Sequence, residues 1–158
     1  MPEYTENEKR NMATVEAMFA PGETEEKVDL FADDAVWWNG LPFVGEPGQT
    51  EHKGKEAIRG ILVGSGTRRS SDSGVDVYDL STSSAEDVIM LADGDYVVRQ
   101  QTFRATTHGG QDYCNVYCFV YRMNADNKIQ YLTEHWNTWH AYNVLFNNWA
   151  LEPAHPEG

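Results

Sequence analysis

The chain has 158 residues, the length of one domain with room for a substantial hydrophobic core, and we expect a single domain over residues 1–158. Apolar residues make up 41% and aromatic residues 12% of the sequence, which indicates a folded protein rather than a disordered one. The formal net charge of −13 disfavours nucleic acid and anionic membrane surfaces as partners, because both carry negative charge.

The sequence also favours a cytoplasmic location. Its first ten residues, MPEYTENEKR, lack the apolar core of a signal peptide, and no apolar run approaches the length that spans a membrane. Cys114 and Cys118 lie on one predicted strand, which places their Cα atoms roughly 13 Å apart and prevents a mutual disulfide. We expect both to be buried free thiols in a reducing compartment.

Helical periodicity dominates the first half of the chain. Apolar side chains at Met12, Val15, Met18 and Phe19 form a helical stripe that ends before Pro21-Gly22. A stretch rich in Gly and Pro is typical of a loop that could cover a site. In chain order, the predicted elements are helices over 6–19 and 23–31, a strand over 35–39, the loop over 40–53, a helix over 55–62 and a polar connector over 64–74.

The second half of the chain predicts an antiparallel meander. Asp93-Gly94 and Gly109-Gly110 are two-residue hairpin signals, and residues 124–127 form a longer turn. The predicted strands cover 86–92, 95–107, 111–123 and 128–139, and a helix over 141–149 follows. Helices followed by long strands predict an α+β fold, with a strongly curved antiparallel sheet wrapped around N-terminal helices to form a cone with an interior pocket.

The last predicted strand has one face that carries unusually varied polar groups. Strand alternation separates Tyr131, Thr133, His135 and Asn137 from Leu132, Glu134, Trp136 and Thr138. A phenol, a hydroxyl, an imidazole and a carboxamide on one face indicate the wall of a polar pocket. We therefore expect the face with His135 to point inward.

The candidate catalytic residues follow from this orientation. His135 is the group that titrates near neutral pH, so we expect it to act as the acid and base. Arg99 supplies a fixed positive charge for an oxyanion or phenolate, and Asn39 and Asn137 would orient the substrate. The predicted substrate-binding residues are Trp37, Gln101, Tyr113, Asn115, Tyr117, Phe119, Tyr131, Thr133 and Trp139.

Two structural alternatives remain open for these residues. His135 could be a hydrogen-bonded core histidine, and Arg99 could pair with an interior carboxylate. No metal is expected, because His135 and His140 have no third ligand at a suitable spacing. The aromatic lining predicts a small aromatic substrate and one-base proton transfer without a cofactor.

Four segments resemble the nuclear-transport-factor-two-like superfamily, in particular its SnoaL-like branch. They are LFADDAVWWNGLP (30–42), GKEAIRG (54–60), LADGDYVVRQQTFRA (91–105) and DNKIQYLTEHWNTW (126–139). The resemblance implies an α+β cone that forms a homodimer. It also implies kinship with ketosteroid isomerases, polyketide cyclases, limonene epoxide hydrolases and cofactor-free lyases, and with members that catalyse nothing.

This chain lacks the acids that those enzymes use. Asn39 stands where ketosteroid isomerases carry their catalytic Asp, and Asn137 stands where polyketide cyclases often carry an acid. The Asp-Arg-Asp set of the epoxide hydrolases aligns with Gln101, Arg99 and Asn137. An amide cannot take a proton from water, so epoxide hydrolysis by that mechanism is not expected.

The sequence therefore predicts a cofactor-independent lyase, dehydratase or isomerase that acts on a small aromatic compound. Loss of water or formaldehyde from a lignin-type diaryl compound, as in some relatives, is a special case. The alternatives are a non-catalytic binding module for an aromatic small molecule and a polyketide cyclase-like enzyme.

Overall fold

A computed structural model describes residues 3–40, 51–67, 76 and 78–145 of the chain. The elements within these ranges are α1 (Glu6–Phe19), α2 (Thr24–Val28), β1 (Phe31–Trp38), β2 (Glu51–Lys53), α3 (Gly54–Thr67), β3 (Tyr78–Asp93), β4 (Tyr96–Thr107), β5 (Asp112–Met123), β6 (Ile129–Trp136) and α4 (Thr138–Leu145). Most of the predicted loop over 40–53, most of the predicted connector over 64–74 and the end of the predicted last helix lie outside the described residues.

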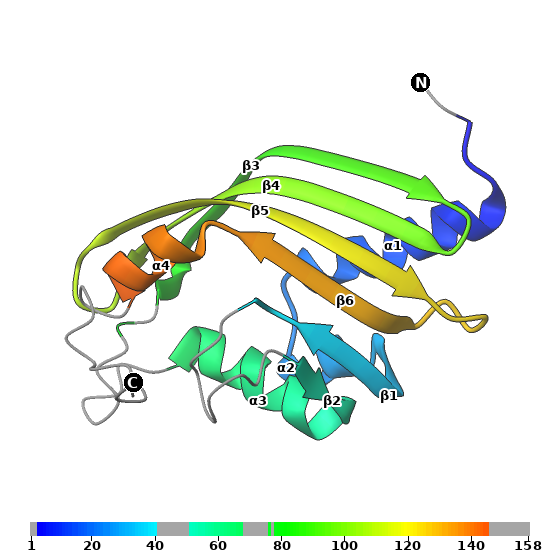
Figure 1. Ribbon diagram of the computed structural model, residues 1–158, viewed down its shortest axis with the longest axis horizontal. Coiled ribbons are helices and arrows are strands. Elements are labelled where there is room, and N and C mark those ends of the chain that lie inside the picture. The colour runs from blue at the N-terminus through cyan, green and yellow to red at the C-terminus, as the bar shows by residue number, and fades with distance from the viewer. Residues whose placement is uncertain (1–2, 41–50, 68–75, 77, 146–158) are drawn as a thin grey trace, which may run out of the picture.

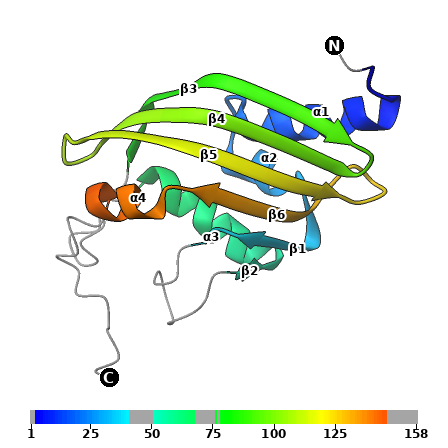
Figure 2. The same ribbon diagram turned by 45° about the horizontal axis from the view of Figure 1, so that its top comes forward.

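The six strands form one curved sheet in the order β2-β1-β6-β5-β4-β3. β3 to β6 pair antiparallel as a meander, and β1 joins β6 in parallel. Figures 1 and 2 show the long strands arching over the N-terminal helices, and the edge strands β2 and β3 do not pair with each other. The predicted α+β fold, with its curved sheet wrapped around helices, is confirmed.

Helix α1 connects two turns of the meander. Its start is fixed by a capping box between Thr5 and Glu8. In its middle, the buried Asn11 donates a hydrogen bond to the backbone oxygen of Gly94 (3.2 Å) and accepts one from Asn127 Nδ2 (2.6 Å). Gly94 has φ 58°, which favours glycine in the β3–β4 turn. One helix side chain therefore holds both the β3–β4 and the β5–β6 turns.

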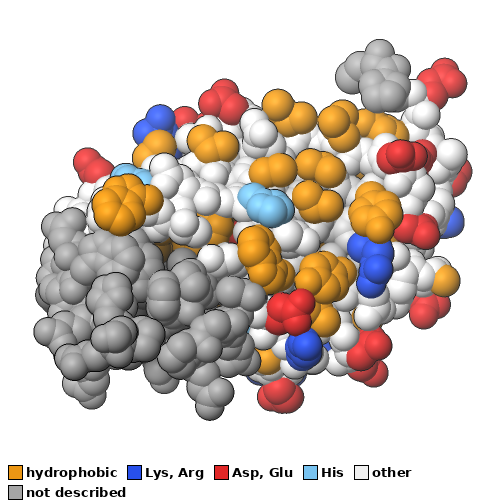
Figure 3. Space-filling model, viewed as in Figure 1, with side chains coloured by type: hydrophobic (Ala, Val, Ile, Leu, Met, Phe, Trp, Pro, Cys, Tyr) orange, Lys and Arg blue, Asp and Glu red, His pale blue; other side chains and the backbone are white. Residues whose placement is uncertain are grey.

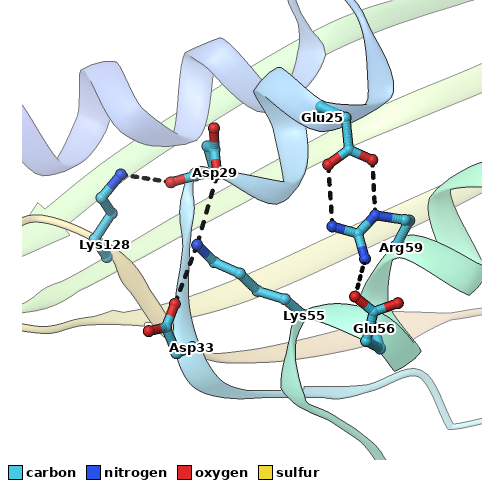
Figure 4. A network of polar contacts seen from close by, with 7 residues as sticks. All are labelled: Glu25, Asp29, Asp33, Lys55, Glu56, Arg59 and Lys128. Carbon is cyan, nitrogen blue, oxygen red and sulfur yellow. Dashed lines mark hydrogen bonds and ion pairs between the residues drawn. The ribbon is translucent and has the colours of Figure 1, made fainter.

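Ion pairs connect α3 to α2 and to the start of β1 (Figure 4). Arg59 donates hydrogen bonds to both carboxylate oxygens of Glu25, at 2.7 and 3.0 Å, and also contacts Glu56. Lys55 lies 3.6 Å from Asp29 and 3.2 Å from Asp33. The acidic partners are exposed, so water screens these pairs, and they serve mainly to orient α3.

Several element boundaries differ from the predictions. Phe31 was expected in a helix, but it begins β1 and its Cα pairs with that of Ile129, so tertiary strand pairing overrides the local helical signal. β2 was missed because it covers only three residues inside the predicted loop. β3 begins at Tyr78, eight residues before the predicted start at Glu86.

The end of the last strand was also placed too late. Asn137 Oδ1 accepts a hydrogen bond (3.0 Å) from the backbone N–H of His140, which is the geometry of a helix N-cap. This cap ends β6 at Trp136 and starts α4 at Thr138. Trp139 was predicted in the strand and lies in the helix instead.

Candidate functional site

The concave face of the sheet carries aromatic and polar side chains from four strands. Strand pairing places Arg99, Phe119 and Glu134 in one row across β4, β5 and β6, and Gln101, Tyr117 and Trp136 in the next. Seven predicted site residues are buried on this side, and inward placement was correct for Trp37, Arg99, Gln101, Tyr113, Asn115, Tyr117 and Phe119.

The predicted orientation of β6 is wrong. His135 pairs with Cys118 on the convex side, where it is exposed and its ring contacts that of Trp38 (centroids 5.3 Å apart). Leu132, Glu134 and Trp136 face the core instead, because the two larger apolar side chains bury more surface than Thr133 and His135 would. The catalytic role of His135 was inferred from an inward orientation that the strand does not have.

The other predicted residues near the end of β6 also lie away from the concave face. Thr133 and Tyr131 are on the convex side, and the Tyr131 hydroxyl donates to Glu51 (3.0 Å). Asn137 and Trp139 are exposed at the start of α4. The Cys114 thiol, predicted to be buried, is exposed on β5, although both cysteines are free as expected.

Asn39 lies just after β1 and is half-buried. Its Nδ2 is 3.2 Å from Nε2 of His52, a residue whose pKa is lowered by burial. The indole of Trp136 donates to the backbone oxygen of Asn39 (2.7 Å). Asn39 is thereby joined to the inward side of β6.

Glu134 is the residue that sequence reasoning missed. It is a carboxylic acid on the inward side of β6, and Trp37 Nε1 donates a hydrogen bond to its Oε2 (2.9 Å). The described residues provide no hydrogen bond to Oε1. Burial raises the pKa of Glu134 to about 7, and the Trp37 hydrogen bond partly opposes that rise. Such a group can both accept and donate a proton near neutral pH.

One signal in the sequence could have found Glu134. It is a single carboxylate between Leu132 and Trp136 on the more apolar face of the strand. An acid on an apolar face is uncommon unless it is paired or functional. Alternation separates the two faces of a strand but does not say which one is inside, and the apolar face was the better choice.

Two tyrosine hydroxyls meet on the same concave face of the sheet as Glu134. Tyr113 OH and Tyr117 OH lie 2.7 Å apart, and Asn115 Nδ2 donates to Tyr113 OH (2.9 Å). Asn115 also exchanges hydrogen bonds with the backbone of Asn137, at 3.0 and 3.1 Å. Burial raises the pKa of Tyr113 to about 12 and raises that of Tyr117 as well, so both hydroxyls stay protonated and can donate.

Replacing Trp37 by Phe tests the local control of Glu134. The substitution removes the one hydrogen bond that lowers the pKa of this carboxyl, so we expect that pKa to rise by about one unit. A ¹³C NMR titration of the Glu134 carboxyl measures it. Trp136→Phe is the matched control, since its indole donates to a backbone oxygen rather than to the carboxylate. Equal shifts in both variants would contradict the assigned contact.

Neither a metal centre nor a membrane span is evident in the described part of the chain. No group of three or more His, Cys, Asp or Glu side chains there could hold a metal ion. None of the helices described is long and apolar enough to cross a membrane.

A family model described as "SnoaL-like domain" matches residues 12–132. No curated protein matches the chain significantly. Among solved structures, an NTF2-like protein of unknown function from Burkholderia pseudomallei K96243 superposes with TM-score 0.65 at 16% identity, covering 86% of this chain and 97% of that one. An LEH-like epoxide hydrolase from M. tuberculosis gives TM-score 0.58 at 16% identity, covering 92% and 98%.

A phenazine biosynthesis-related protein from Pseudomonas aeruginosa has the same fold. It superposes with TM-score 0.64 at 17% identity, covering 92% of this chain and 88% of that one. At these identities the structural likeness shows the fold alone.

Proposed function

Because this chain belongs to the SnoaL-like domain family, whose fold also supports isomerases and hydrolases, we propose that it is a cofactor-independent lyase, dehydratase or isomerase. The proposed substrate is a small aromatic compound, and the proposed acid and base is Glu134 in place of His135. One observation carries the proposal: the half-buried Glu134 lies beside Phe119 on the aromatic inner face of the sheet and accepts a hydrogen bond from Trp37, and burial raises its pKa to about 7.

The proposed reaction begins with proton removal by ionised Glu134. The proton comes from a carbon beside a carbonyl, and the C–H electrons move onto the carbonyl oxygen to form an enolate. Protonated Glu134 can then return the proton to another carbon, which is isomerisation. Alternatively, it gives the proton to a departing β-hydroxyl as the enolate collapses, which releases water. A pKa near the working pH makes both transfers possible for one residue.

The tyrosine pair can stabilise the enolate oxygen. If the Tyr113 hydroxyl donates the shared hydrogen bond to Tyr117, the Tyr117 hydroxyl group remains free to donate to a substrate oxygen. Asn115 favours this direction, because its own donation occupies an acceptor position on Tyr113. An aromatic substrate suits the surrounding rings, since Tyr117 stacks on Trp136 and Phe119 with centroids 5.3 and 5.5 Å apart.

Loss of water from a lignin-type diaryl compound that carries a carbonyl group is one elimination of this kind. Loss of formaldehyde would begin instead with removal of the hydroxyl proton of a CH₂OH group by Glu134. The O–H electrons then form the C=O bond of formaldehyde, the C–C bond breaks with its electrons moving onto the substrate carbonyl oxygen, and protonated Glu134 returns the proton to carbon.

Hydrogen exchange in D₂O tests the function across a panel of candidate substrates. Aryl ketones and aryl β-hydroxy carbonyl compounds are incubated with the protein, and ¹H NMR follows loss of the α-proton signal or formation of an alkene. We expect at least one compound to exchange or eliminate faster with the wild type than with Glu134→Gln. Compounds that bind but are recovered without deuterium would favour the alternative of a non-catalytic binding module.

We also propose that a second copy of the chain covers the convex face of the sheet. Exposed apolar side chains gather there over β3–β6 (Figure 3), including Ile89, Leu91, Tyr96 and Val116. The chain carries a net charge of −13, so two copies repel each other least where their facing surfaces hold few acids. A homodimer through this apolar face satisfies that condition.

The substitution Val116→Lys tests the homodimer. In Val116→Lys, an exposed residue of the apolar face becomes charged, and we expect the dimer to dissociate at least tenfold more readily because each copy would place a charged ammonium in an apolar interface. Light scattering after size-exclusion chromatography gives the mass. Val63→Lys, an exposed apolar residue on α3, is the control. A monomeric wild type at micromolar concentration would refute the homodimer.

A further inference from the structure

Arg99 is a buried cation for which the described residues provide no counter-ion. Its side chain is on the concave face of β4 and the residue is only 8% exposed. No described carboxylate lies within ion-pair distance of its guanidinium, although seven ion-pair contacts occur elsewhere in that part of the chain. This excludes, among described residues, the interior ion pair that was one sequence-based alternative for Arg99.

The guanidinium is nevertheless held in a defined position. Nε donates to Gln101 Oε1 (2.8 Å), and the carbon Cζ lies 4.0 Å from the centre of the Phe19 ring. Gln101 stands where the resemblance places an epoxide hydrolase carboxylate, and as a neutral amide it orients the cation without neutralising it. Glu16 on α1 attracts the guanidinium only at longer range, and burial lowers the pKa of Arg99.

The two terminal nitrogens of Arg99 make no hydrogen bond to a described residue. They form the end of the guanidinium fork, whose N–H groups match the two oxygens of a carboxylate. The side chain is buried but the guanidinium is only partly removed from water, and a partly desolvated cation is stabilised by a paired anion. A bound carboxylate would supply both the missing charge and the missing acceptors, whereas a phenolate offers only one oxygen.

We propose that Arg99 binds the carboxylate of the substrate, so that the substrate is a small aromatic carboxylic acid in its anionic form. Arg99 and Glu134 flank Phe119 in one row of the sheet, and two strand spacings separate their Cα atoms by roughly 10 Å. An aromatic ring between the two side chains would lie against Phe119, with its carboxylate at Arg99 and its reacting carbon at Glu134. This inference rests on the proposed function, because it names the substrate class of the same site.

Calorimetric titration with matched acids and amides tests the proposal. Benzoate and 2-naphthoate are compared with benzamide and 2-naphthamide at pH 7. We expect the wild type to bind at least one acid about 10- to 100-fold more tightly than its amide, the range expected for hydrogen bonds to a charged group. Arg99→Gln should lose this preference. Arg104→Gln removes the same charge from an exposed position on β4 and should keep it.

Glu134→Gln separates this proposal from the proposed function. We expect this variant to bind the acids as tightly as the wild type even where it has lost turnover. A thermal melt with and without 2-naphthoate checks folding, since the acid should raise the Tm of the wild type but not that of a folded Arg99→Gln. Amides that bind as tightly as the acids, no acid binding at 10 mM, or an unchanged preference in Arg99→Gln would each overturn the role of Arg99 and leave that of Glu134 standing.

Discussion

Glu134→Gln should lower kcat by about 10²–10⁴-fold with little change in substrate binding. The amide has nearly the shape of the carboxyl and keeps an oxygen to accept the Trp37 hydrogen bond, but it cannot take up a proton at neutral pH. Steady-state kinetics on a compound identified by hydrogen exchange measures the change. The wild-type kcat/KM should also fall as the pH drops below about 7, because protonated Glu134 cannot act as a base.

His135→Gln provides the matched control for that substitution. His135 is adjacent in sequence but exposed on the convex side, so we expect its replacement to change kcat less than about twofold. A large loss in His135→Gln, together with near wild-type turnover in Glu134→Gln, would restore the histidine as the base and remove Glu134 from the mechanism.

The second large effect is on stability and depends on pH. The pKa of Glu134 is about 7 in the folded protein and near its ordinary 4.5 in the unfolded chain. Between these values the unfolded chain has released the proton that the folded protein still holds, so rising pH favours unfolding. The carboxyl therefore costs no stability below about pH 4.5, and the free energy of unfolding falls by about 3 kcal/mol as the pH rises through 7.

Glu134→Gln should abolish that loss. We expect the free energy of unfolding of the variant, relative to that of the wild type, to increase by about 3 kcal/mol from pH 4 to pH 8, because the amide does not titrate. Urea unfolding followed by Trp fluorescence gives both free energies at each pH. Glu16→Gln, at an exposed position of α1, should leave the wild-type pH dependence unchanged. If the free energies of unfolding of wild type and Glu134→Gln changed in parallel with pH, the pKa of the Glu134 carboxyl would not be raised in the folded protein.

The predictions from sequence were most accurate for helices and turns that are determined by local signals. Helix α1 has the predicted bounds because its apolar stripe and Pro21-Gly22 are both local. The turns at Gly94 and Gly110, both with positive φ, likewise matched their dipeptide signals. The two hairpins therefore lie where the sequence placed them, and the residues predicted to point inward on β4 and β5 do so.

The elements that failed depend on contacts between distant parts of the chain. The start of β1 is set by pairing with β6, and the end of β6 is set by the Asn137 cap rather than by a breaker. The face of β6 was misassigned because varied polar groups were taken to mark a pocket, whereas in the structure they cover the convex side. The residue that indicated the candidate site was instead Glu134, a single acid between the apolar Leu132 and Trp136.

A direct titration of the Glu134 carboxyl tests the central claim without a substrate. Specific ¹³C labelling of glutamate, with Glu134→Gln to assign the resonance, follows its ionisation from pH 4 to pH 9. A midpoint of about 7 is the result we expect, because burial beside Trp37 raises the pKa of the half-buried Glu134. A midpoint below about 5, the range of an ordinary solvated glutamate, would contradict it.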